Sequence, residues 1–301
     1  MQLYKKGKVK EVYEASEGEF EFLFTDQISV FDKVIPTLVP DKGETLCRTS
    51  AFWFKEAARL GICTHFLGLP AGNRMRVKRV SIPKPGVPLK KTDRNVLVPL
   101  EVIARYYVAG SLHDRLKAGE LSPLALGFGN SSVPAYGAEL PQPFIEFTTK
   151  LEKTDRPLTH REASELSGLG RDRLDEIRQM VLKVDAEMNR KARSQGLLHV
   201  DGKKEFGIDT EGEIMLVDTF GTADEDRWWD LKLYGEGKTV DISKESVRQY
   251  YRETGYHDML MDARKRRQHE PDIPPLPAEM VGKVTQIYVN LFERITGTKF
   301  R

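Results

Sequence analysis

The sequence predicts an α+β fold in which a strand-rich N-terminal part precedes a larger C-terminal part that mixes strands with long helices. Three β-like runs support the first part, and polar and apolar residues alternate at the start of the first run: Glu19–Thr25, Ile28–Ile35 and Met75–Ile82. The cluster Pro83-Lys-Pro-Gly-Val-Pro88 breaks regular structure, so we expect a β-rich lobe at 1–88 and an α/β lobe at 89–301. A chain of 301 residues is long enough for about two such domains.

Helices are expected where apolar residues recur at three- and four-residue spacing. Asp172–Arg193 carries one such apolar stripe, formed by Leu174, Ile177, Val181, Val184 and Met188. A helix is expected at Thr45–Arg59, before Gly61, and a final helix is expected after Pro277, with Gly297 as its stop. The segment 197–217 is expected to form a pair of strands.

Composition and charge exclude several classes of protein. The chain has 47 Lys+Arg and 45 Asp+Glu, so its net charge of +2 does not indicate a general nucleic-acid or membrane surface. Cys47 and Cys63 form no CxxC pair and cannot supply a thiolate zinc site by themselves. No apolar segment approaches the roughly 20 residues that span a bilayer, and the N-terminus has no apolar signal segment. We therefore expect a cytoplasmic protein that binds anions through local clusters of cations.

The hairpin within 199–218 is the segment that best suggests a metal site. A two-residue turn at Glu211-Gly212 would place Glu205 opposite Asp218, with Cβ atoms about 5 Å apart. The apolar residues Phe206 and Ile208 would then share the other face. Opposed carboxylates repel, and Mg²⁺ commonly takes one or two protein carboxylates together with water and phosphate oxygens. A solvent-facing hairpin with a screened charge pair is the alternative, and a slip of one residue would undo the geometry.

Two lysines near the N-terminus suggest a polyphosphate site. In Gly7-Lys-Val-Lys-Glu-Val-Tyr13, period two places Lys8 and Lys10 on one face of an expected strand, and Gly7 permits close approach of the backbone. The chain contains no Walker A sequence. Exposed lysines without a ligand are the alternative.

Several ordered motifs resemble the phosphoribosylaminoimidazole-succinocarboxamide synthases, or SAICAR synthetases. The segment 97–111 is similar to one family signature, and Asp201-x-Lys-x-Glu-Phe-Gly207 is similar to a second. Gly7–Tyr13 resembles the opening phosphate-contacting strand of the family, and Asp26–Asp32 and Pro274–Phe300 resemble further blocks. The likeness extends over nearly the whole chain.

This resemblance implies a fold, a reaction and a set of ligands. The fold would be two-lobed and kinase- or ATP-grasp-like, with an ATP-binding β-rich lobe. The enzyme would use ATP and Mg²⁺ to join L-aspartate to a carboxyaminoimidazole ribonucleotide, giving SAICAR, ADP and phosphate in de novo purine biosynthesis. An acyl phosphate would serve as the intermediate, because a free carboxylate does not react with an amine at neutral pH. We expect small-molecule partners only and a monomer or small homo-oligomer.

The resemblance also implies roles for individual residues. Those expected at ATP are Gly7, Lys8, Lys10, Met75 and Val77, and those expected at the metal are Glu205 and Asp218. Catalytic roles are expected for Lys203, Arg105 and Asp155. Contacts with the other substrates are expected for Ser29, Asp32, Arg105, Ser111, Arg227, Lys244 and Arg248.

The chain departs from the usual pattern of the family near the expected acceptor and amine sites. Thr219 follows Asp218 where the family commonly has Glu, and Lys204 stands where an apolar residue is usual. A ligase or phosphotransferase of the same fold with a different acceptor is therefore an alternative. A non-catalytic nucleotide-binding protein is a third reading, and Lys8, Lys10, Glu205 and Asp218 argue against it.

Overall fold

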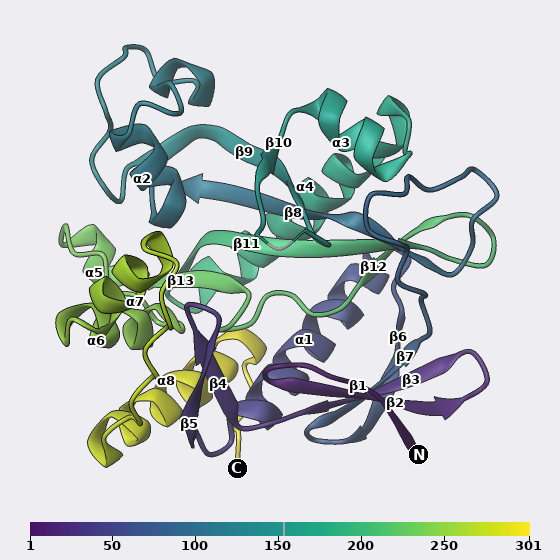
Figure 1. Cartoon of the computed structure of the whole chain (residues 1–301), viewed down its shortest axis with the longest axis horizontal. Coiled ribbons are helices and arrows are strands. Elements are labelled where there is room, and N and C mark those ends of the chain that lie inside the picture. Colours follow the sequence, from purple (N-terminus) through teal and green to yellow (C-terminus); the bar gives the residue numbers. More distant parts are fainter. Residues whose placement is uncertain (153) are drawn as a thin grey trace.

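The computed structural model describes residues 1–152 and 154–301 and contains two large antiparallel sheets (Figure 1). The first sheet has the strand order β1-β2-β3-β7-β6. Its strands are β1 (Gln2–Lys6), β2 (Lys10–Ser16), β3 (Glu19–Phe24), β6 (Phe66–Ala71) and β7 (Arg74–Lys78). Helix α1 (Lys42–Arg59) packs against β3, β6 and β7 of this sheet.

The second sheet has the order β10-β9-β8-β11-β12, and β13 also pairs with β11. Its strands are β8 (Val96–Tyr107), β9 (Glu139–Thr149), β10 (Pro157–Leu158), β11 (Leu197–Ile208), β12 (Ile214–Val217) and β13 (Asp226–Asp230). The long strands β8 and β11 cross the middle of the molecule, so they can carry side chains to the region between the sheets (Figure 1).

The remaining elements cover the second sheet or connect the two sheets. They are the hairpin β4 (Gln27–Val30) and β5 (Lys33–Leu38), helices α2 (Gly110–Lys117), α3 (His160–Ser167), α4 (Arg171–Ser194), α5 (Leu231–Gly235), α6 (Glu245–Glu253), α7 (Tyr256–Lys265) and α8 (Ala278–Thr296), and a 3₁₀ turn at Pro123–Leu126. Helix α4 packs on β8 and β11, and α8 packs on α1. Across the described ranges, no helix combines the length and the apolar character needed to cross a membrane.

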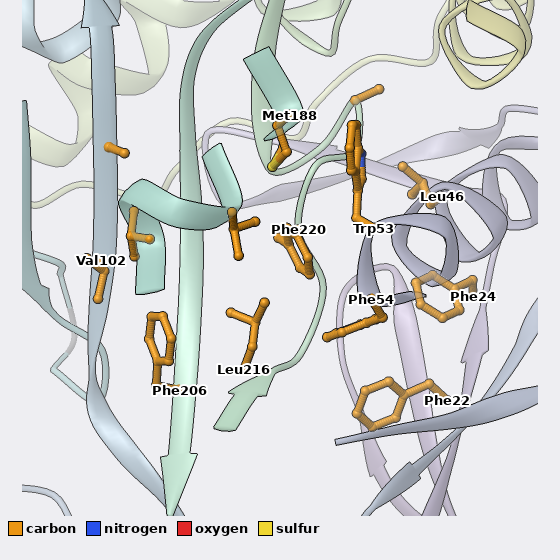
Figure 2. Packing of buried hydrophobic residues seen from close by; sticks show 14 of the residues in the cluster. Phe22, Phe24, Leu46, Trp53, Phe54, Val102, Met188, Phe206, Leu216 and Phe220 are labelled. Carbon is orange, nitrogen blue, oxygen red and sulfur yellow. The ribbon is translucent and has the colours of Figure 1, made fainter. Parts of the chain in front are cut away.

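One hydrophobic core runs from the first sheet through α1 to the second sheet (Figure 2). Phe22 and Phe24 of β3 lie on one side of Phe54, and Phe220 and Phe206 lie on the other side. Trp53 of α1 is fully buried, and its indole nitrogen donates a hydrogen bond to the carbonyl of Gly221 at 3.0 Å. The two sheets are therefore held together by packing, and a polar region lies beside this core.

The helices expected from the sequence are confirmed. The apolar stripe of α4 is buried, from Leu174 to Met188, and α8 ends at Gly297 with a φ of 67°. The β-like run expected at Ile28–Ile35 is divided between β4 and β5, because Phe31 and Asp32 adopt φ values of 50° and 64° and form the turn. The limits 1–88 and 89–301 for the two lobes stay a prediction.

The N-terminal strand expected at Gly7–Tyr13 is wrong in its first residues. Strand β1 ends at Lys6 and β2 begins at Lys10, so Gly7 and Lys8 lie in the connection between them. The amide of Gly7 donates to the carbonyl of Lys10 at 2.8 Å, and a Cβ on Gly7 would lie only 2.9 Å from that oxygen. Position 7 favours glycine because the backbone at Gly7 approaches the backbone at Lys10 so closely that a Cβ would collide with it.

The hairpin register expected from the sequence is wrong by one residue. Glu205 pairs with Val217, and Phe206 pairs with Leu216. The connection is longer than a two-residue turn because the Asp209 carboxylate accepts hydrogen bonds from the amides of Glu211 and Glu213, at 2.9 and 2.8 Å. Asp218 therefore lies just beyond the end of β12.

Candidate active site

Two cavities meet beside β11. The first has a volume of about 340 Å³ and is lined by both sheets. Its apolar lining comes from Val9, Val12, Phe20, Phe22, Val80, Ile82, Leu97 and Val217. Its charged lining comes from Lys5, Lys8, Lys10, Lys78, Lys150, Glu205, Asp218 and Glu225. This cavity can therefore accept a ligand with an apolar part and a strongly anionic part.

The second cavity is smaller, about 180 Å³, and mostly polar. Its charged and hydroxyl side chains are Arg105, Ser111, Asp201, Lys203, Asp224, Glu225, Asp226, Arg227, Ser243 and Arg248. Three arginines in one small cavity suit an anion such as a carboxylate or a phosphate. Glu225 belongs to the linings of both cavities, so the two sites adjoin there.

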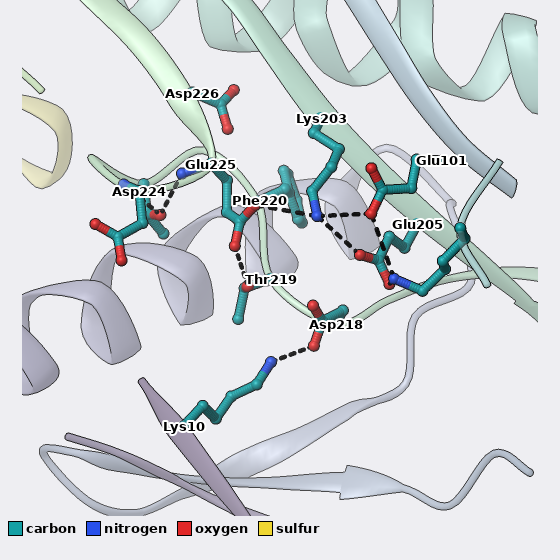
Figure 3. Close-up of polar contacts among 12 residues, drawn as sticks. Lys10, Glu101, Lys203, Glu205, Asp218, Thr219, Phe220, Asp224, Glu225 and Asp226 are labelled. Atoms are coloured by element: carbon teal, nitrogen blue, oxygen red, sulfur yellow. Dashed lines mark hydrogen bonds and ion pairs between the residues drawn. The ribbon is translucent and has the colours of Figure 1, made fainter. Parts of the chain in front are cut away.

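Asp218 and Glu205 lie in the first cavity although they do not pair across the strands. Asp218 has a φ of 61°, and this left-handed conformation ends β12 and turns its side chain toward the cavity. It forms an ion pair with Lys10 of β2. Glu205 is bound by Lys203 at 3.0 Å and by Lys150 at 2.5 Å (Figure 3).

These lysines keep the two carboxylates ionised. Burial alone would raise the pKa of Asp218, but Lys10, Lys150 and Lys203 hold it well below its ordinary value. Burial and the charge of Asp218 oppose ionisation of Glu205, and Lys203 and Lys150 outweigh them and lower the pKa of Glu205. Both side chains therefore present charged oxygens.

The chemistry of this donor set fits a magnesium ion that has few protein ligands. Ionised carboxylates are the oxygen ligands that Mg²⁺ takes, together with water and phosphate oxygens. Within the described residues, no three His, Cys, Asp or Glu side chains gather in a way that could hold a metal ion, so Glu205 and Asp218 form a pair only.

Two of the three arginines of the second cavity, Arg105 and Arg227, are held by carboxylates from neighbouring strands. The Nε of Arg105 donates to Glu146 at 2.8 Å, and its terminal nitrogen donates to the Ser111 hydroxyl at 3.2 Å. Arg227 donates to Asp201 at 2.6 Å. Since β8, β11 and β13 carry these groups side by side, the sheet itself sets the spacing of the cations.

Lys244 lies behind the wall of the second cavity. Its ammonium is 3.8 Å from the Asp224 carboxylate, which also binds the buried Lys42 at 2.9 Å and accepts a hydrogen bond from Tyr288. Burial lowers the pKa of Lys244. The charge of the Asp224 carboxylate therefore offsets the charges of two lysines, Lys42 and Lys244, that are far apart in the sequence.

Several residues expected at the site lie elsewhere. Met75 and Val77 are fully buried in the hydrophobic core, whereas Lys78, Val80 and Ile82 line the first cavity. The assignment of Met75 and Val77 to the adenine pocket stays a prediction. Of the described residues, four further candidates lie outside the linings of both cavities: Ser29, Asp32, Asp155 and Lys244.

Two of these four lie exposed in connections between strands. Asp32, at the tip of the β4–β5 hairpin, forms an ion pair with Lys8 at 2.6 Å, so it reaches a residue of the first cavity. Asp155 is exposed in the connection between β9 and β10. The spacing of residues in the sequence does not show that Asp32 and Asp155 lie outside the linings of the two cavities.

Sequence reasoning missed three residues that the structure brings to the site. Lys150, at the end of β9, binds Glu205, and Glu101 of β8 lies 3.0 Å from Lys203. Glu225 joins the two cavities. Glu101 lies within the family signature at 97–111, and this was its signal in the sequence. The contacts of these residues join separate strands, which sequence spacing does not predict.

Comparisons with known proteins all lead to one family. A family model described as SAICAR synthetase matches residues 3–262. The chain is 50% identical over 300 residues to a phosphoribosylaminoimidazole-succinocarboxamide synthase of Thermoplasma acidophilum, with 100% of each chain covered. A protein of the same name from Thermoplasma volcanium is 48% identical over 300 residues, again with 100% of each chain covered.

Solved structures give the same result. A SAICAR synthetase (Type-2) in complex with ADP matches with a TM-score of 0.72 and 26% identity, and 100% of each chain is covered. A SAICAR synthase from Saccharomyces cerevisiae complexed with SAICAR matches with a TM-score of 0.75 and 25% identity, over 99% of this chain and 95% of that chain.

Proposed function

The chain belongs to the SAICAR synthetase family, and we propose that its two cavities hold the two ends of the reaction of that family. The protein is an ATP-dependent carbon–nitrogen ligase of purine biosynthesis, which joins L-aspartate to carboxyaminoimidazole ribonucleotide. One observation supports assigning a different substrate to each cavity. At Glu225, a lysine-rich cavity with apolar walls adjoins an arginine-rich cavity.

ATP occupies the first cavity in this proposal. The adenine ring lies against apolar side chains such as Val80, Ile82 and Leu97, and the phosphates lie against Lys8 and Lys10. In the structure these lysines pair with Asp32 and Asp218. The phosphates therefore compete with protein carboxylates for the same cations.

The acceptor occupies the second cavity. Arg105 and Ser111 hold its carboxylate, and Arg227 and Arg248 hold its ribose phosphate, because the guanidinium fork matches both anions. Lys203 lines this cavity and also contacts Glu205 of the first cavity, so its ammonium lies where phosphoryl transfer would occur. Ser29, Asp32 and Lys244 remain proposed substrate contacts and Asp155 remains a proposed catalytic residue, although none of these four described residues lines either cavity.

The reaction proceeds in two steps. A carboxylate oxygen of the acceptor attacks the γ-phosphorus of ATP, and ADP leaves. The amine of L-aspartate then attacks the carbonyl carbon of the acyl phosphate, and phosphate leaves with loss of one proton from nitrogen. Most of the work of the protein is to position the two anions and to offset their charge with lysine and arginine.

Magnesium belongs to the same proposal. Glu205 and Asp218 would hold the ion, and bound Mg²⁺ would neutralise charge on the phosphates as the phosphoryl group moves. The protein would act in the cytoplasm, where ATP and phosphorylated nucleotides are found, as a monomer or small homo-oligomer.

Phosphate release tests the function. The protein is incubated with ATP, Mg²⁺, carboxyaminoimidazole ribonucleotide and L-aspartate, and each component is omitted in turn. We expect formation of SAICAR with one phosphate per product. If ATP turnover does not respond to aspartate, the chain acts on a different acceptor or amine. If no phosphate is released with active reagents, the ligase function is wrong.

A further inference from the structure

Glu225 is placed between the two cavities by contacts at both of its carboxylate oxygens (Figure 3). Its Oε2 lies 3.3 Å from the Lys203 ammonium, and its Oε1 accepts a hydrogen bond from the Thr219 hydroxyl at 3.4 Å. The side chain is 23% exposed, so it is reachable from the cavities. Glu225 is thus a partly accessible carboxylate at the place where the proposed ATP site and acceptor site adjoin.

The loop that carries Glu225 is fixed on either side of it. Asp224 is bound by the buried Lys42 at 2.9 Å, and Asp226 is fully buried against His199 at 2.6 Å. The amide of Glu225 is also directed toward the Thr222 hydroxyl at 3.4 Å. With both neighbours anchored in the interior, Glu225 has little freedom to leave the junction.

Three carboxylates share the ammonium of Lys203. Glu101 and Glu205 each lie 3.0 Å from it and come from β8 and β11. Glu225 comes from the loop between β12 and β13, and it is the partner that also lines the second cavity. Without Glu225, the remaining contacts of Lys203 would draw its ammonium toward Glu101 and Glu205, away from the second cavity.

We propose that Glu225 is a positioning residue that holds the Lys203 ammonium at the junction, between the phosphate donor and the acceptor carboxylate. This inference rests on the proposed function, because it needs ATP in the first cavity and the acceptor in the second. Glu225 acts through Lys203 and is supported by the hydroxyl of Thr219. Its contribution is to the geometry of phosphoryl transfer and much less to the binding of either substrate.

Steady-state kinetics of Glu225→Gln test this role. A reacting group misplaced by about 1 Å can cost about 100-fold in rate, so we expect kcat to fall by about that factor. The dissociation constants of ATP and of the acceptor, measured by calorimetry, should change less than about threefold, because the groups that bind them remain. Glu279→Gln on α8, an exposed carboxylate paired with Lys283, is the matched control and should keep wild-type kinetics.

Moving the carboxylate separates positioning from a structural role. Because Thr219 touches Glu225, a glutamate at position 219 can bring a carboxylate to nearly the same place. Glu225→Ala alone should lose kcat, and the double variant Thr219→Glu/Glu225→Ala should recover to within about tenfold of the wild type. A carboxylate needed only for folding would not be restored in this way.

The outcomes are distinguishable. If the wild type makes no SAICAR, the proposed function fails and so does the role of Glu225. If the wild type is active and Glu225→Gln keeps its kcat, the inference alone is wrong. It is also wrong if Glu225→Gln lowers only the melting temperature, or if the double variant stays as inactive as Glu225→Ala.

Discussion

Lys10 of β2 forms an ion pair with Asp218, the residue that directly follows β12, and this contact joins the first sheet to the second. The pair lies in the wall of the first cavity. Because β2 and β12 belong to different sheets, the affinity for a ligand that contacts both residues depends on the relative position of the two sheets. Binding of ATP should therefore be sensitive to either partner.

Removing one charge at the proposed metal position should stop turnover. We expect Glu205→Gln and Asp218→Asn each to lower kcat at least about 100-fold, because the charge that develops on the phosphoryl group would lose its counter-charge. Both should retain the wild-type circular dichroism spectrum. Titration with Mn²⁺ in the presence of ATP, followed by electron paramagnetic resonance, should give weaker binding in both variants. Wild-type rates in either variant would refute the metal role.

The sequence predicted helices better than it predicted the hairpin. The stripe of α4 needs only local periodicity, and it is buried from Leu174 to Met188. The register of β11 and β12 depends on the connection, where the Asp209 side chain binds two amides and makes the loop longer than a two-residue turn. Asp218 still reaches the first cavity, because its φ of 61° turns the chain after β12.

The sequence predicted the proximity of site residues that lie in the same motif, but not of residues that come from separate segments. Lys203 and Glu205 are two residues apart on one strand, so their side chains were expected on the same face. In the structure the Lys203 ammonium lies 3.0 Å from the Glu205 carboxylate. Lys150 approaches them from just beyond the end of β9, and Glu225 from the loop before β13. No spacing in the sequence links these segments. Met75 and Val77 were assigned to ATP by resemblance to the family, and both are buried in the core, so their role stays a prediction.

The buried pair of Lys204 and Asp185 explains one departure from the family pattern and makes a stability prediction. Both side chains are fully buried, and Tyr106 donates a hydrogen bond to Asp185 at 2.9 Å. Asp185→Asn leaves a buried lysine without its counter-charge, so we expect a loss of about 3–5 kcal/mol in the free energy of unfolding, measured with urea.

The double variant Lys204→Met/Asp185→Asn provides the control. It removes both charges and keeps an acceptor for Tyr106, so most of the lost stability should return. If the double variant is as unstable as Asp185→Asn, the ion pair is not the cause.

Gly110 makes room for Arg227, and this predicts a change in substrate affinity. A Cβ on Gly110 would lie 2.8 Å from both terminal nitrogens of Arg227, and Gly110 has a φ of 52°. We expect Gly110→Ala to displace the guanidinium and to raise the KM for carboxyaminoimidazole ribonucleotide about tenfold, the effect of losing about one charged hydrogen bond.

Gly119→Ala is the matched control for this substitution. Gly119 has a φ of 73°, and nothing lies within 4 Å of the Cβ position. Both variants carry a similar backbone strain and should lose similar stability, but only Gly110→Ala should change KM. An equal change of KM in both variants would contradict the contact with Arg227.

Asp241 should make stability depend on pH in a direction opposite to that of an ordinary salt-bridged carboxylate. Burial raises its pKa from 3.8 to about 6, although Arg227 and Ser243 oppose the shift, and Glu245 and Asp201 add to it. The side chain is 15% exposed. Because the folded state favours the protonated form, its contribution to stability is complete below pH 3.8 and is lost as the pH rises through about 6.

The substitution Asp241→Asn fixes the neutral form and so isolates this contribution. Relative to the wild type, the variant should gain little at pH 4 and up to about 3 kcal/mol in the free energy of unfolding at pH 8, measured with urea. Taking the difference between the two proteins at each pH removes the titration of all other groups. Asp114→Asn, at a side chain that is 81% exposed, should show a difference close to zero at both pH values. A gain for Asp241→Asn that does not change with pH would mean that the carboxylate is ionised throughout, held by Arg227.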